Sequence, residues 1–518
     1  MRQSRLEIES VVVSAAQMQE IEGRVFAAGM PVAALMEKAA VKLAQRIISL
    51  FRDDRISRVG ILVGPGHNGG DALVVARELH LAGYSVILFR PISKAKELTQ
   101  QHANYAASLG ISCCEDVAAL QDCDLIIDGL FGFGQTRNIE GKLAEVVQEI
   151  NSWDKLVVSI DLPSGIHTDT GEVLGVAVAA THTFCLGLWK RAFFQDQALQ
   201  YLGEAELINI GIPVAEVRNV CGSSPQIQRF TVNKAKECLP LPRPAVTHKY
   251  KQGHLLLICG SERYAGGAIL TALGAKASGV GMLSIAVPEK LKPLLVSKLP
   301  EALVIGCPET EDGGIASLPA IASEFASYDA IACGPGLTLA AKPIVQQVLQ
   351  AENTLILDAD GLNILAELDT IPTLAQRAHE TILTPHPAEF KRLFPEIPHP
   401  NSDRLQSVQK AAQESNSIIL LKGSRTAIAS PQGSVWVIPD STPALARGGS
   451  GDVLTGLMGG LVAQNIATEK PLDATVATAA WWHAQAGIFA AQERSELGVD
   501  AFTLAQYLIP FLSKKLNK

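Results

Sequence analysis

The sequence predicts an α/β protein of two consecutive domains, the first of them doubly wound. Three observations lead to this prediction. The chain has 518 residues, too many for one ordinary hydrophobic core. Short apolar runs suited to buried parallel strands alternate with helical patterns along the chain. Many of these runs end in a polar loop containing glycine or proline, and the carboxyl ends of strands are where open α/β sheets bind ligands.

Composition narrows the class of protein. A hydrophobic content of 47% and a charged content of 19% are typical of a soluble globular protein. The net charge of −8 offers no electrostatic attraction for nucleic acid or an anionic membrane, so we expect neither as a partner. Nine scattered cysteines without a C-x-x-C pair indicate reduced thiols in the cytoplasm. Residues 1–14 lack the apolar segment of a signal peptide, and residues 474–491 favour a buried helix over a membrane span.

The first domain opens with helices over residues 14–50 and then a strand, a glycine loop and a helix. The apolar run 59–63 predicts a buried strand, and a helix follows through residue 81. Between them, residues 64–71 read Gly-Pro-Gly-His-Asn-Gly-Gly-Asp, a Rossmann-like phosphate-binding arrangement. The Gly-x-Gly-x-x-Gly spacing alone is a weak signal, and the Gly-Lys-Ser/Thr of a P-loop is missing. The acidic ribose ligand is also missing after the strand at 86–90, which disfavours an ordinary dehydrogenase.

Two further strands of this domain end in polar side chains. One ends at Asp128 and the next at Asp161, with Ser164 three residues later. Because the carboxyl ends of parallel strands meet at one crevice, these side chains should converge with Asn68. Helix capping would explain a single aspartate, but four polar groups after three apolar strands favour a binding site.

The motifs at these strand ends resemble those of the NAD(P)H-hydrate epimerases. They are Asn68-Gly69-Gly70-Asp71, Asp128-Gly129-Leu130-Phe131-Gly132 and Asp161-Leu162-Pro163-Ser164-Gly165, and the resemblance covers residues 10–215. It implies that Asn68, Asp128 and Ser164 hold a potassium ion. The residues that it implies for contact with the hydrated dinucleotide are His67, Asn68, Gly69, Gly70, Asp71, Gly132, Phe133, Gly134, Gln135, Thr136, Arg137, Asn138 and Asp161.

Three residues of this domain need separate comment. We expect Asp161 to be the acid/base catalyst of epimerisation. His67 stands where asparagine is commoner, and Phe133 interrupts a loop that usually reads Gly-Thr-Gly, but neither change removes an ion ligand. Lys190 matches a family lysine near the site, although a solvated lysine is a fair alternative interpretation.

The pattern loosens between residues 214 and 250, where three prolines follow one another closely. We place the boundary here, with domains at 1–224 and 225–518 and a strand-helix entry over 225–250. The second domain then shows five apolar strands, each leading into a polar loop with glycine or proline. They cover residues 255–258, 329–333, 355–360, 382–384 and 418–422. Five such strands predict a second parallel sheet with one shared crevice.

The last loop of the second domain is the richest in glycine. Gly448-Gly449-Ser450-Gly451 precedes Asp452 and an apolar helix pattern. A helix start of this kind presents free backbone N–H groups and a positive dipole end to an anion. Asp452 would lie in the first turn, where a carboxylate can take the proton of a hydroxyl that attacks phosphorus. The alternative is a glycine-rich turn in which Asp452 only caps the helix.

Together these strand ends resemble the ribokinase-like fold, and within it the NAD(P)H-hydrate dehydratases. The resemblance covers residues 225–512 and rests on the stretches 384–389, 358–363, 422–424 and 248–250. It implies an adenine nucleotide held by Lys422, Gly423, Ser424, Arg425, Thr426 and Gly451. It implies hydrate contacts from Ala268, Gly336, His386 and Asp452. It also implies Mg²⁺ in this domain and ADP as phosphoryl donor, with ATP left open.

The combined resemblance is to the bifunctional NAD(P)H-hydrate repair enzymes. It implies epimerisation of R- and S-NAD(P)HX and dehydration of the S epimer to NAD(P)H, with AMP and phosphate released from ADP. The expected partners are NADHX, NADPHX and ADP, and we expect a cytoplasmic homo-oligomer. One alternative is a small-alcohol kinase of the ribokinase family fused to a cofactor-binding domain. Another is a non-enzymatic interaction role for the first domain.

Overall fold

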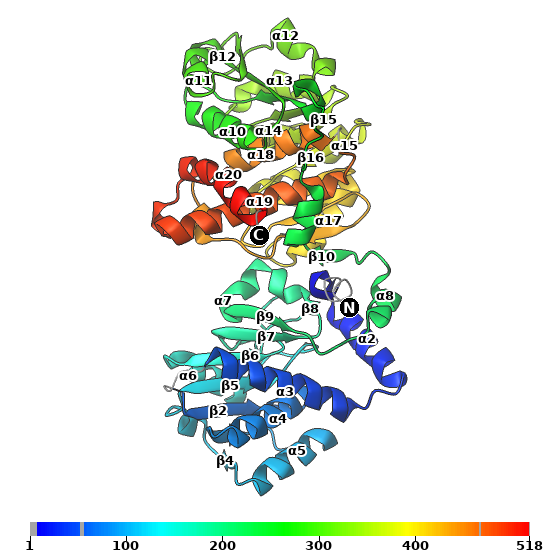
Figure 1. Ribbon diagram of the computed structural model, residues 1–518, viewed down its shortest axis with the longest axis vertical. Helices are drawn as coiled ribbons and strands as arrows, with labels where there is room; N and C mark the ends of the chain where they lie inside the picture. The colour runs from blue at the N-terminus through cyan, green and yellow to red at the C-terminus, as the bar shows by residue number, and fades with distance from the viewer. Residues whose placement is uncertain (1–7, 52–55, 466–467, 517–518) are drawn as a thin grey trace. The chain divides into compact units, whose positions relative to one another are not determined.

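A computed structural model describes residues 8–51, 56–465 and 468–516. Residues 1–7, part of the segment assessed for a signal peptide, lie outside the described residues. The chain divides into two compact units, Met1–Ile227 and Gln228–Lys518. In Figure 1 the first unit runs from blue to blue-green and the second from green to red. Both units consist of a mainly parallel sheet with helices, so the predicted α/β class is confirmed.

The first unit contains a seven-stranded parallel sheet in the order β4-β3-β2-β5-β6-β7-β9. Its strands are β2 (Arg58–Val63), β3 (Ser85–Phe89), β4 (Ser112–Cys114), β5 (Leu125–Gly129), β6 (Leu156–Ile160), β7 (His182–Leu186) and β9 (Glu204–Ile208). A separate short parallel pair is formed by β1 (Val12–Val13) and β8 (Trp189–Lys190). The three strands that end at the predicted site, β2, β5 and β6, are direct neighbours.

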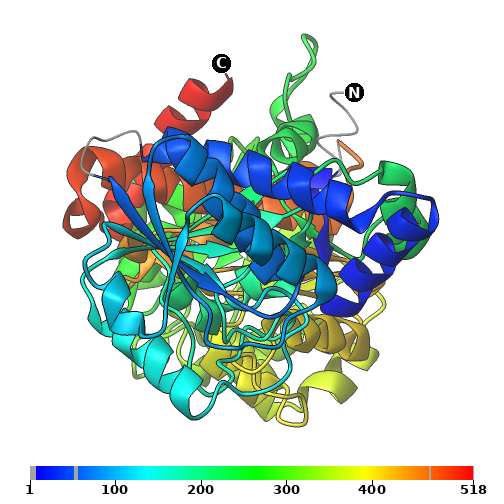
Figure 2. The ribbon, with the colours of Figure 1, turned by 90° about the horizontal axis from the view of Figure 1, so that it is seen from below.

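Helices of the first unit pack on both faces of the sheet (Figure 2). They are α2 (Ala15–Ala27), α3 (Val32–Leu50), α4 (His67–Leu81), α5 (Glu97–Ser108), α6 (Lys142–Ser152), α7 (Leu199–Leu202) and α8 (Val214–Cys221). Along β2, Ile61 packs in one hydrophobic cluster with α3 and α4, whereas Leu62 packs in another with α6. This alternation is the period of two that a strand buried on both faces requires.

One boundary in this unit differs from the prediction. We placed residues 64–71 in a loop, but α4 already begins at His67, so Asn68 to Asp71 form its first turn. Gly69 makes this close turn possible, because a Cβ on it would lie 1.9 Å from the carbonyl oxygen of Gly64. The strand therefore passes into the helix within a few residues.

The second unit contains a ten-stranded sheet in the order β10-β19-β18-β17-β16-β15-β14-β11-β12-β13. Its strands are β10 (Ile227–Arg229), β11 (His254–Ile258), β12 (Met282–Pro288), β13 (Leu303–Cys307), β14 (Ala330–Cys333), β15 (Thr354–Leu357), β16 (Thr381–Leu383), β17 (Ile418–Leu421), β18 (Ala427–Ala429) and β19 (Val435–Val437). The five predicted strands are β11, β14, β15, β16 and β17, which are consecutive neighbours and parallel. The sequence did not show the strands β12 and β13, or the antiparallel pair β18 and β19.

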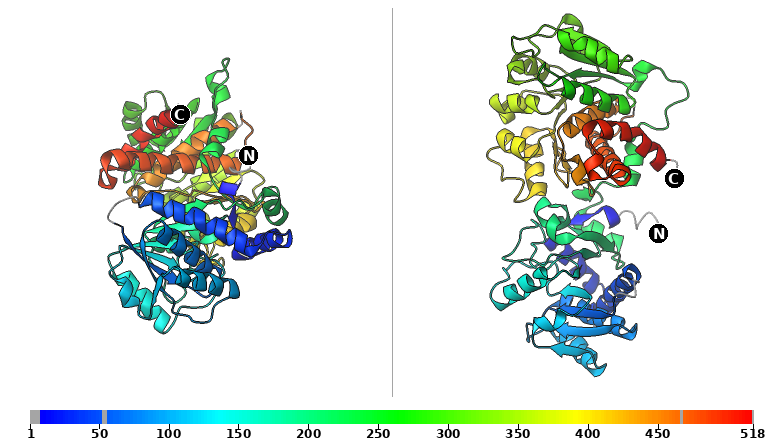
Figure 3. Two further views of the ribbon diagram at one scale, coloured as in Figure 1. Left: turned by 60° about the horizontal axis from the view of Figure 1, so that its bottom comes forward. Right: turned by 90° about the vertical axis from the view of Figure 1, so that its left-hand side faces the viewer.

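Helices surround this second sheet (Figure 3). They are α9 (Val232–Cys238), α10 (Ala265–Ala277), α11 (Lys292–Lys298), α12 (Ala320–Ser323), α13 (Lys342–Leu349), α14 (Asp360–Glu367), α15 (Thr370–Ala375), α16 (Pro387–Leu393), α17 (Arg404–Ser415), α18 (Ser450–Asn465), α19 (Leu472–Arg494) and α20 (Ala501–Leu516). Among the described residues, no helix is both long and apolar enough to cross a membrane. The stretch 474–491 lies in α19 and is largely buried, as expected.

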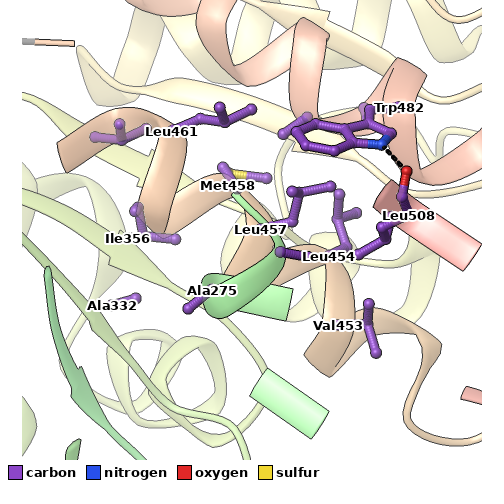
Figure 4. Close-up of a cluster of buried hydrophobic side chains, with 14 of the residues drawn as sticks. Ala275, Ala332, Ile356, Val453, Leu454, Leu457, Met458, Leu461, Trp482 and Leu508 are labelled. Carbon is purple, nitrogen blue, oxygen red and sulfur yellow. Dashed lines mark hydrogen bonds between the residues drawn. The ribbon is translucent and has the colours of Figure 1, made fainter. Parts of the chain in front are cut away.

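Helix α18 is central to the core of the second unit (Figure 4). Val453, Leu457 and Met458 are buried in its hydrophobic cluster, and Trp482 of α19 donates its indole N–H to the carbonyl of Leu508 at 2.8 Å. Neighbouring α10 approaches so closely that a Cβ on Gly456 would lie 1.7 Å from the carbonyl oxygen of Thr271. The packing therefore holds the first turn of α18, which carries Asp452, in a defined place.

Candidate active sites

A cavity of about 1000 Å³ lies at the carboxyl ends of the parallel strands of the first unit. Helices α2, α3 and α4 line one part of it, and the loops after β5 and β6 line another. The sequence-predicted residues that line it are His67, Asn68, Asp71, Gly132, Phe133, Gly134, Gln135, Thr136, Arg137, Asn138 and Asp161. Gly69 and Gly70 are buried in the first turn of α4 and shape this wall. The motifs far apart in sequence are therefore brought to one cavity.

The loop 132–138 is held to its neighbours by hydrogen bonds. The N–H of Phe133 donates to Asp161 Oδ2 at 2.9 Å, and the N–H of Gly134 donates to the hydroxyl of Thr168 at 3.0 Å. Gln135 Oε1 accepts from the N–H of Gly165 at 2.9 Å. These bonds join the loop after β5 to the loop after β6, so both sides of the cavity are positioned together.

A buried ion pair lies in the wall of this cavity. Lys190 Nζ is 2.5 Å from Asp161 Oδ1 and donates to the carbonyl of Leu186 at 2.6 Å. Asp161 has a φ of 68°, a strained conformation for a residue with a side chain, and strain of this kind gathers at functional sites. Burial disfavours the charged form of Lys190, but the carboxylate of Asp161 outweighs this effect and raises the lysine pKa. Lys190 has 0% exposure, so the interpretation as a solvated lysine is wrong.

Two more carboxyl groups line the same cavity. Burial raises the pKa of Glu22 on α2 to about 7, against the opposing charge of Lys190. Burial and the charge of Asp161 also raise the pKa of Asp71 well above its usual range. Sequence analysis missed Glu22. A signal existed, because Glu22 follows Met18 by four residues on a helix, and so lies on the apolar face.

Two of the three expected potassium ligands, Asp128 and Ser164, are hydrogen-bonded to each other. Asp128 is fully buried, and its Oδ1 accepts from the Ser164 hydroxyl at 2.6 Å. Its Oδ2 accepts from the Ser164 N–H and the Ser159 hydroxyl, each at 2.9 Å. Asn68 lies nearby, since its backbone carbonyl oxygen would be 3.3 Å from a Cβ on Gly129. Its amide Nδ2 is buried and has no hydrogen-bond partner among the described residues.

In the second unit, Asp452 lies in the first turn of α18, as predicted. Its carboxylate faces the start of α10, where a Cβ on Gly267 would be 3.4 Å from Oδ2. Burial raises the pKa of Asp452 to about 7, with a further contribution from the negative charge of Asp358. A carboxyl group with a pKa near the working pH suits a general base.

Asp358, at the end of β15, connects the loops around Asp452. It accepts from Lys422 Nζ and from the Thr455 hydroxyl, each at 2.5 Å. Lys422 also lies against Gly451, where a Cβ would be 3.3 Å from the lysine Nζ. The predicted nucleotide residues Lys422 and Gly451 are therefore adjacent, while Gly423 and Ser424 are exposed beside them, and Arg425 and Thr426 are half-buried.

The remaining predicted residues surround this centre. Ala268 is fully buried in α10, and Gly336 adopts a φ of 65° against Tyr264, where a Cβ would clash at 2.8 Å. His386 caps α16, its Nδ1 accepting from the N–H groups of Ala388 and Glu389. Sequence analysis did not single out His483, which is buried and contacts Ser450 through Nε2. Burial lowers the pKa of His483 to about 4, so it is neutral.

Comparisons with known proteins agree with both halves of this description. A family model described as NAD(P)H-hydrate dehydratase matches residues 255–510, and one described as YjeF-related protein N-terminus matches residues 32–192. The bifunctional NAD(P)H-hydrate repair enzyme of Synechocystis sp. is 59% identical over 96% of this chain and 94% of its own length. The chain belongs to this family of repair enzymes.

A second relative also matches the chain over nearly its whole length. The bifunctional NAD(P)H-hydrate repair enzyme of Thermosynechococcus vestitus is 50% identical over 98% of both chains. Among solved structures, the chain is similar to an ADP/ATP-dependent NAD(P)H-hydrate dehydratase from Bacillus subtilis, co-crystallised with ATP and Mg²⁺. That likeness has 32% identity and a TM-score of 0.47, and covers 55% of this chain and 98% of the other. The full-length likeness to the repair enzymes and the two family models do not favour the alternative of a small-alcohol kinase fused to a cofactor-binding domain.

Proposed function

We propose that this chain repairs hydrated NADH and NADPH with two active sites. The first unit interconverts the R and S epimers of NAD(P)HX, and the second dehydrates the S epimer with a phosphoryl donor. The observation that carries the proposal is that each unit places a carboxyl group suited to acid/base catalysis in or beside a lysine–aspartate ion pair, Lys190–Asp161 in one and Lys422–Asp358 in the other. The full-length likeness to the repair enzymes supports the same conclusion.

In the second unit we assign the first proton transfer to Asp452. The substrate carries a hydroxyl on the saturated carbon beside the ring nitrogen, and hydroxide is a poor leaving group. Asp452 takes the hydroxyl proton while the oxygen attacks the terminal phosphorus of ADP, and AMP leaves. The lone pair of the ring nitrogen then expels phosphate, and loss of a neighbouring proton restores the reduced ring. The N–H groups of the turn 448–451 stabilise the negative charge on the phosphoryl group.

ADP and Mg²⁺ fit the groups around Asp452. The loop 422–426 is open to a nucleotide, and the adjacent Gly451 leaves room for a phosphate at the start of α18. Mg²⁺ usually takes one or two carboxylates, with water and phosphate oxygens as its other ligands. Asp358 and Asp360 are the carboxylates whose charges raise the pKa of Asp452, and we assign the ion to this region. When bound, it neutralises phosphate charge.

In the first unit we assign acid/base catalysis to Asp161. Lys190 and the N–H of Phe133 fix the two oxygens of its carboxylate at the cavity wall. The residues 67–71 and 132–138 surround the remaining space and would contact the hydrated nicotinamide and its phosphates. A non-enzymatic role for this unit predicts instead that Asp161→Asn leaves epimer exchange unchanged.

Potassium fits Asn68, Asp128 and Ser164, which offer an amide, a carboxylate and a hydroxyl. These hard oxygen ligands suit an alkali cation. The buried Asn68 amide supports the site, because its unpartnered Nδ2 and its Oδ1 are exchanged by a simple rotation that places a carbonyl oxygen there. A bound ion would hold the turns after β2, β5 and β6 in place. These residues would hold the ion and carry no step of the reaction.

One assay tests the whole proposal. Purified R- and S-NADHX are incubated separately with the protein, and NADH is followed by its absorbance, with ADP and with ATP. We expect the S epimer to be recovered at once, and the R epimer only at the rate of exchange. Recovery from neither epimer with either nucleotide would refute the dehydratase assignment. The expected homo-oligomer and cytoplasmic location stay predictions, which light scattering and cell fractionation test.

A further inference from the structure

Glu22 has no part in the catalytic scheme above, yet it lines the same cavity as Asp161 and Lys190. It extends from α2, whereas Asp161 follows β6 and Lys190 belongs to β8, so three separate elements bring these groups together. The charges of both residues affect the pKa of Glu22: Lys190 lowers it and Asp161 raises it. No hydrogen bond to its carboxyl group occurs among the residues that the structure describes. The cavity therefore contains a carboxyl group available to a bound molecule.

The other carboxyl groups of the cavity are less suited to donate a proton, and one of them, Glu140, is exposed to solvent. Asp161 is tied to Lys190 and accepts N–H groups from Phe133 and Leu186, so both of its carboxyl oxygens are already hydrogen-bonded within the protein. Burial and the negative charge of Asp161 raise the pKa of Asp71 well above its usual range, so it is a weaker proton donor. A group that both gives and regains a proton needs a pKa near the working pH.

We propose that Glu22 is a further catalytic residue of the first unit, the proton donor to the leaving hydroxyl of the hydrated ring. This inference rests on the proposed epimerase function. The carbon–oxygen bond beside the ring nitrogen breaks, and the oxygen leaves as water with the proton of Glu22. The nitrogen lone pair forms the C=N bond and becomes positive. Water then adds to the opposite face and returns one proton to the Glu22 carboxylate, so atoms and charge balance.

The surrounding charges support these roles. The Asp161 side chain, paired with Lys190, stabilises the positive ring, while burial raises the pKa of Glu22 to about 7. The other charged or titratable groups that line the cavity are Asp71, Lys190, Lys96, His67, Arg137 and Glu140. On α8, the helix packed against α2, Glu216 pairs with Arg24 on the exposed side. Glu22 thereby carries the proton transfer within the acid/base catalysis that the scheme above gives to Asp161, and Asp161 stabilises the charge that develops on the ring.

The test uses the full-length protein and three variants, Glu22→Gln, Glu22→Asp and Glu20→Gln. Glu20 is an exposed glutamate on the same helix and is the matched control. Exchange between R- and S-NADHX is followed by chromatography at several pH values, with the uncatalysed exchange subtracted. Dehydration of the S epimer serves as an internal control. Thermal unfolding shows whether the first unit stays folded.

We expect Glu22→Gln to lower kcat for epimer exchange by about 10²–10⁴-fold, the usual effect of losing a general acid. Because the protonated form starts the reaction, the wild-type rate should fall as pH rises through about 7. Glu22→Asp should keep this pH dependence at a reduced rate. Glu20→Gln should behave as wild type, and S-epimer dehydration should be unchanged in all variants.

Two results would count against different claims. If the wild type does not exchange the epimers, the epimerase function itself fails. If the wild type exchanges them but Glu22→Gln keeps its kcat and its pH profile, the role of Glu22 is overturned. Should Glu22→Gln unfold, the wild-type and Glu22→Asp profiles decide: a rate that does not fall through about pH 7 overturns the role.

Discussion

At the scale of single residues, both units pair a lysine with a buried aspartate. Lys190 and Lys422 each lie 2.5 Å from their partners, Asp161 and Asp358. A second carboxyl group nearby, Glu22 or Asp452, then has a pKa raised to about 7 by burial. Two carboxyl groups with separated pKa values in one site can divide the roles of ionised stabiliser and proton carrier.

Replacing Asp452 by Asn should abolish dehydration. The proton acceptor is lost, which usually costs about 10²–10⁴ in rate, while epimer exchange continues because the first unit is unchanged. Since Asp452 acts in its ionised form, the wild-type dehydration rate should fall as pH drops below about 7. NADH formation from the S epimer measures both effects, with the exposed Asp312→Asn as control. Near wild-type NADH recovery by Asp452→Asn would exclude its role as the base.

Potassium should stabilise the first unit through Asp128. An ion that binds only the folded form raises the melting temperature, so potassium should do so more than sodium at equal ionic strength. Asp128→Ala removes the only formal charge of the proposed ligand set. It should abolish the difference in melting temperature between potassium and sodium, and it should slow epimer exchange. The same removal leaves Ser159 and Ser164 without their acceptor, so the melting temperature itself should also fall. Equal melting in both salts for the wild type would argue against the site.

At the scale of elements, the two sites depend on close approaches of helix and backbone. Gly69 brings α4 against the end of β2, and Gly456 brings α18 against α10. Neither approach leaves space for a methyl group. The position of each site therefore follows from residues that carry no chemistry of their own.

Gly456→Ala should destabilise the second unit by at least about 1–3 kcal/mol, because the new methyl forces α18 away from α10. Asp452 is one turn earlier on α18, so dehydration should slow as well. Gly266→Ala on α10 is the matched control, since its Cβ would meet nothing within 4 Å and alanine favours a helix. Chemical denaturation of the two variants checks this, and equal stabilities would show that the approach is not constrained.

At the scale of the whole molecule, each unit has its own sheet and its own hydrophobic clusters. Under the proposed function, repair of both epimers needs both units, because the proposed dehydration acts on the S epimer alone. The arrangement of two activities in one chain means that equal amounts of both are made. It does not make the folding of one unit depend on the other.

Fragments 1–224 and 225–518 should therefore fold separately and keep epimerase and dehydratase activity respectively. The cut keeps β10 (Ile227–Arg229) with the ten-stranded sheet that it joins. Mixing the two fragments should restore repair of R-NADHX. Circular dichroism and the NADH assay measure both properties, and soluble fragments without either reaction would show that the active sites are not self-contained.

The sequence by itself determined the α/β class, the strands that end at the two predicted sites, and the loops that carry Asp161 and Asp452. Apolar runs and glycine loops are local patterns, and strand ends of one parallel sheet must meet, so these inferences needed no coordinates. Sequence patterns did not reveal β12, β13, β18 and β19 of the second sheet, because strand formation depends on the neighbouring strands and on packing.

Only the tertiary structure showed that Lys190 is buried on Asp161, that Lys422 lies on Asp358, and that Glu22 lines the first cavity. Each of these facts joins residues from separate elements, and no spacing in the sequence reports such a distance. The raised pKa values of Glu22 and Asp452 likewise arise from burial. Burial is a property of the packed molecule, since the same carboxyl groups are hydrated in the unfolded chain.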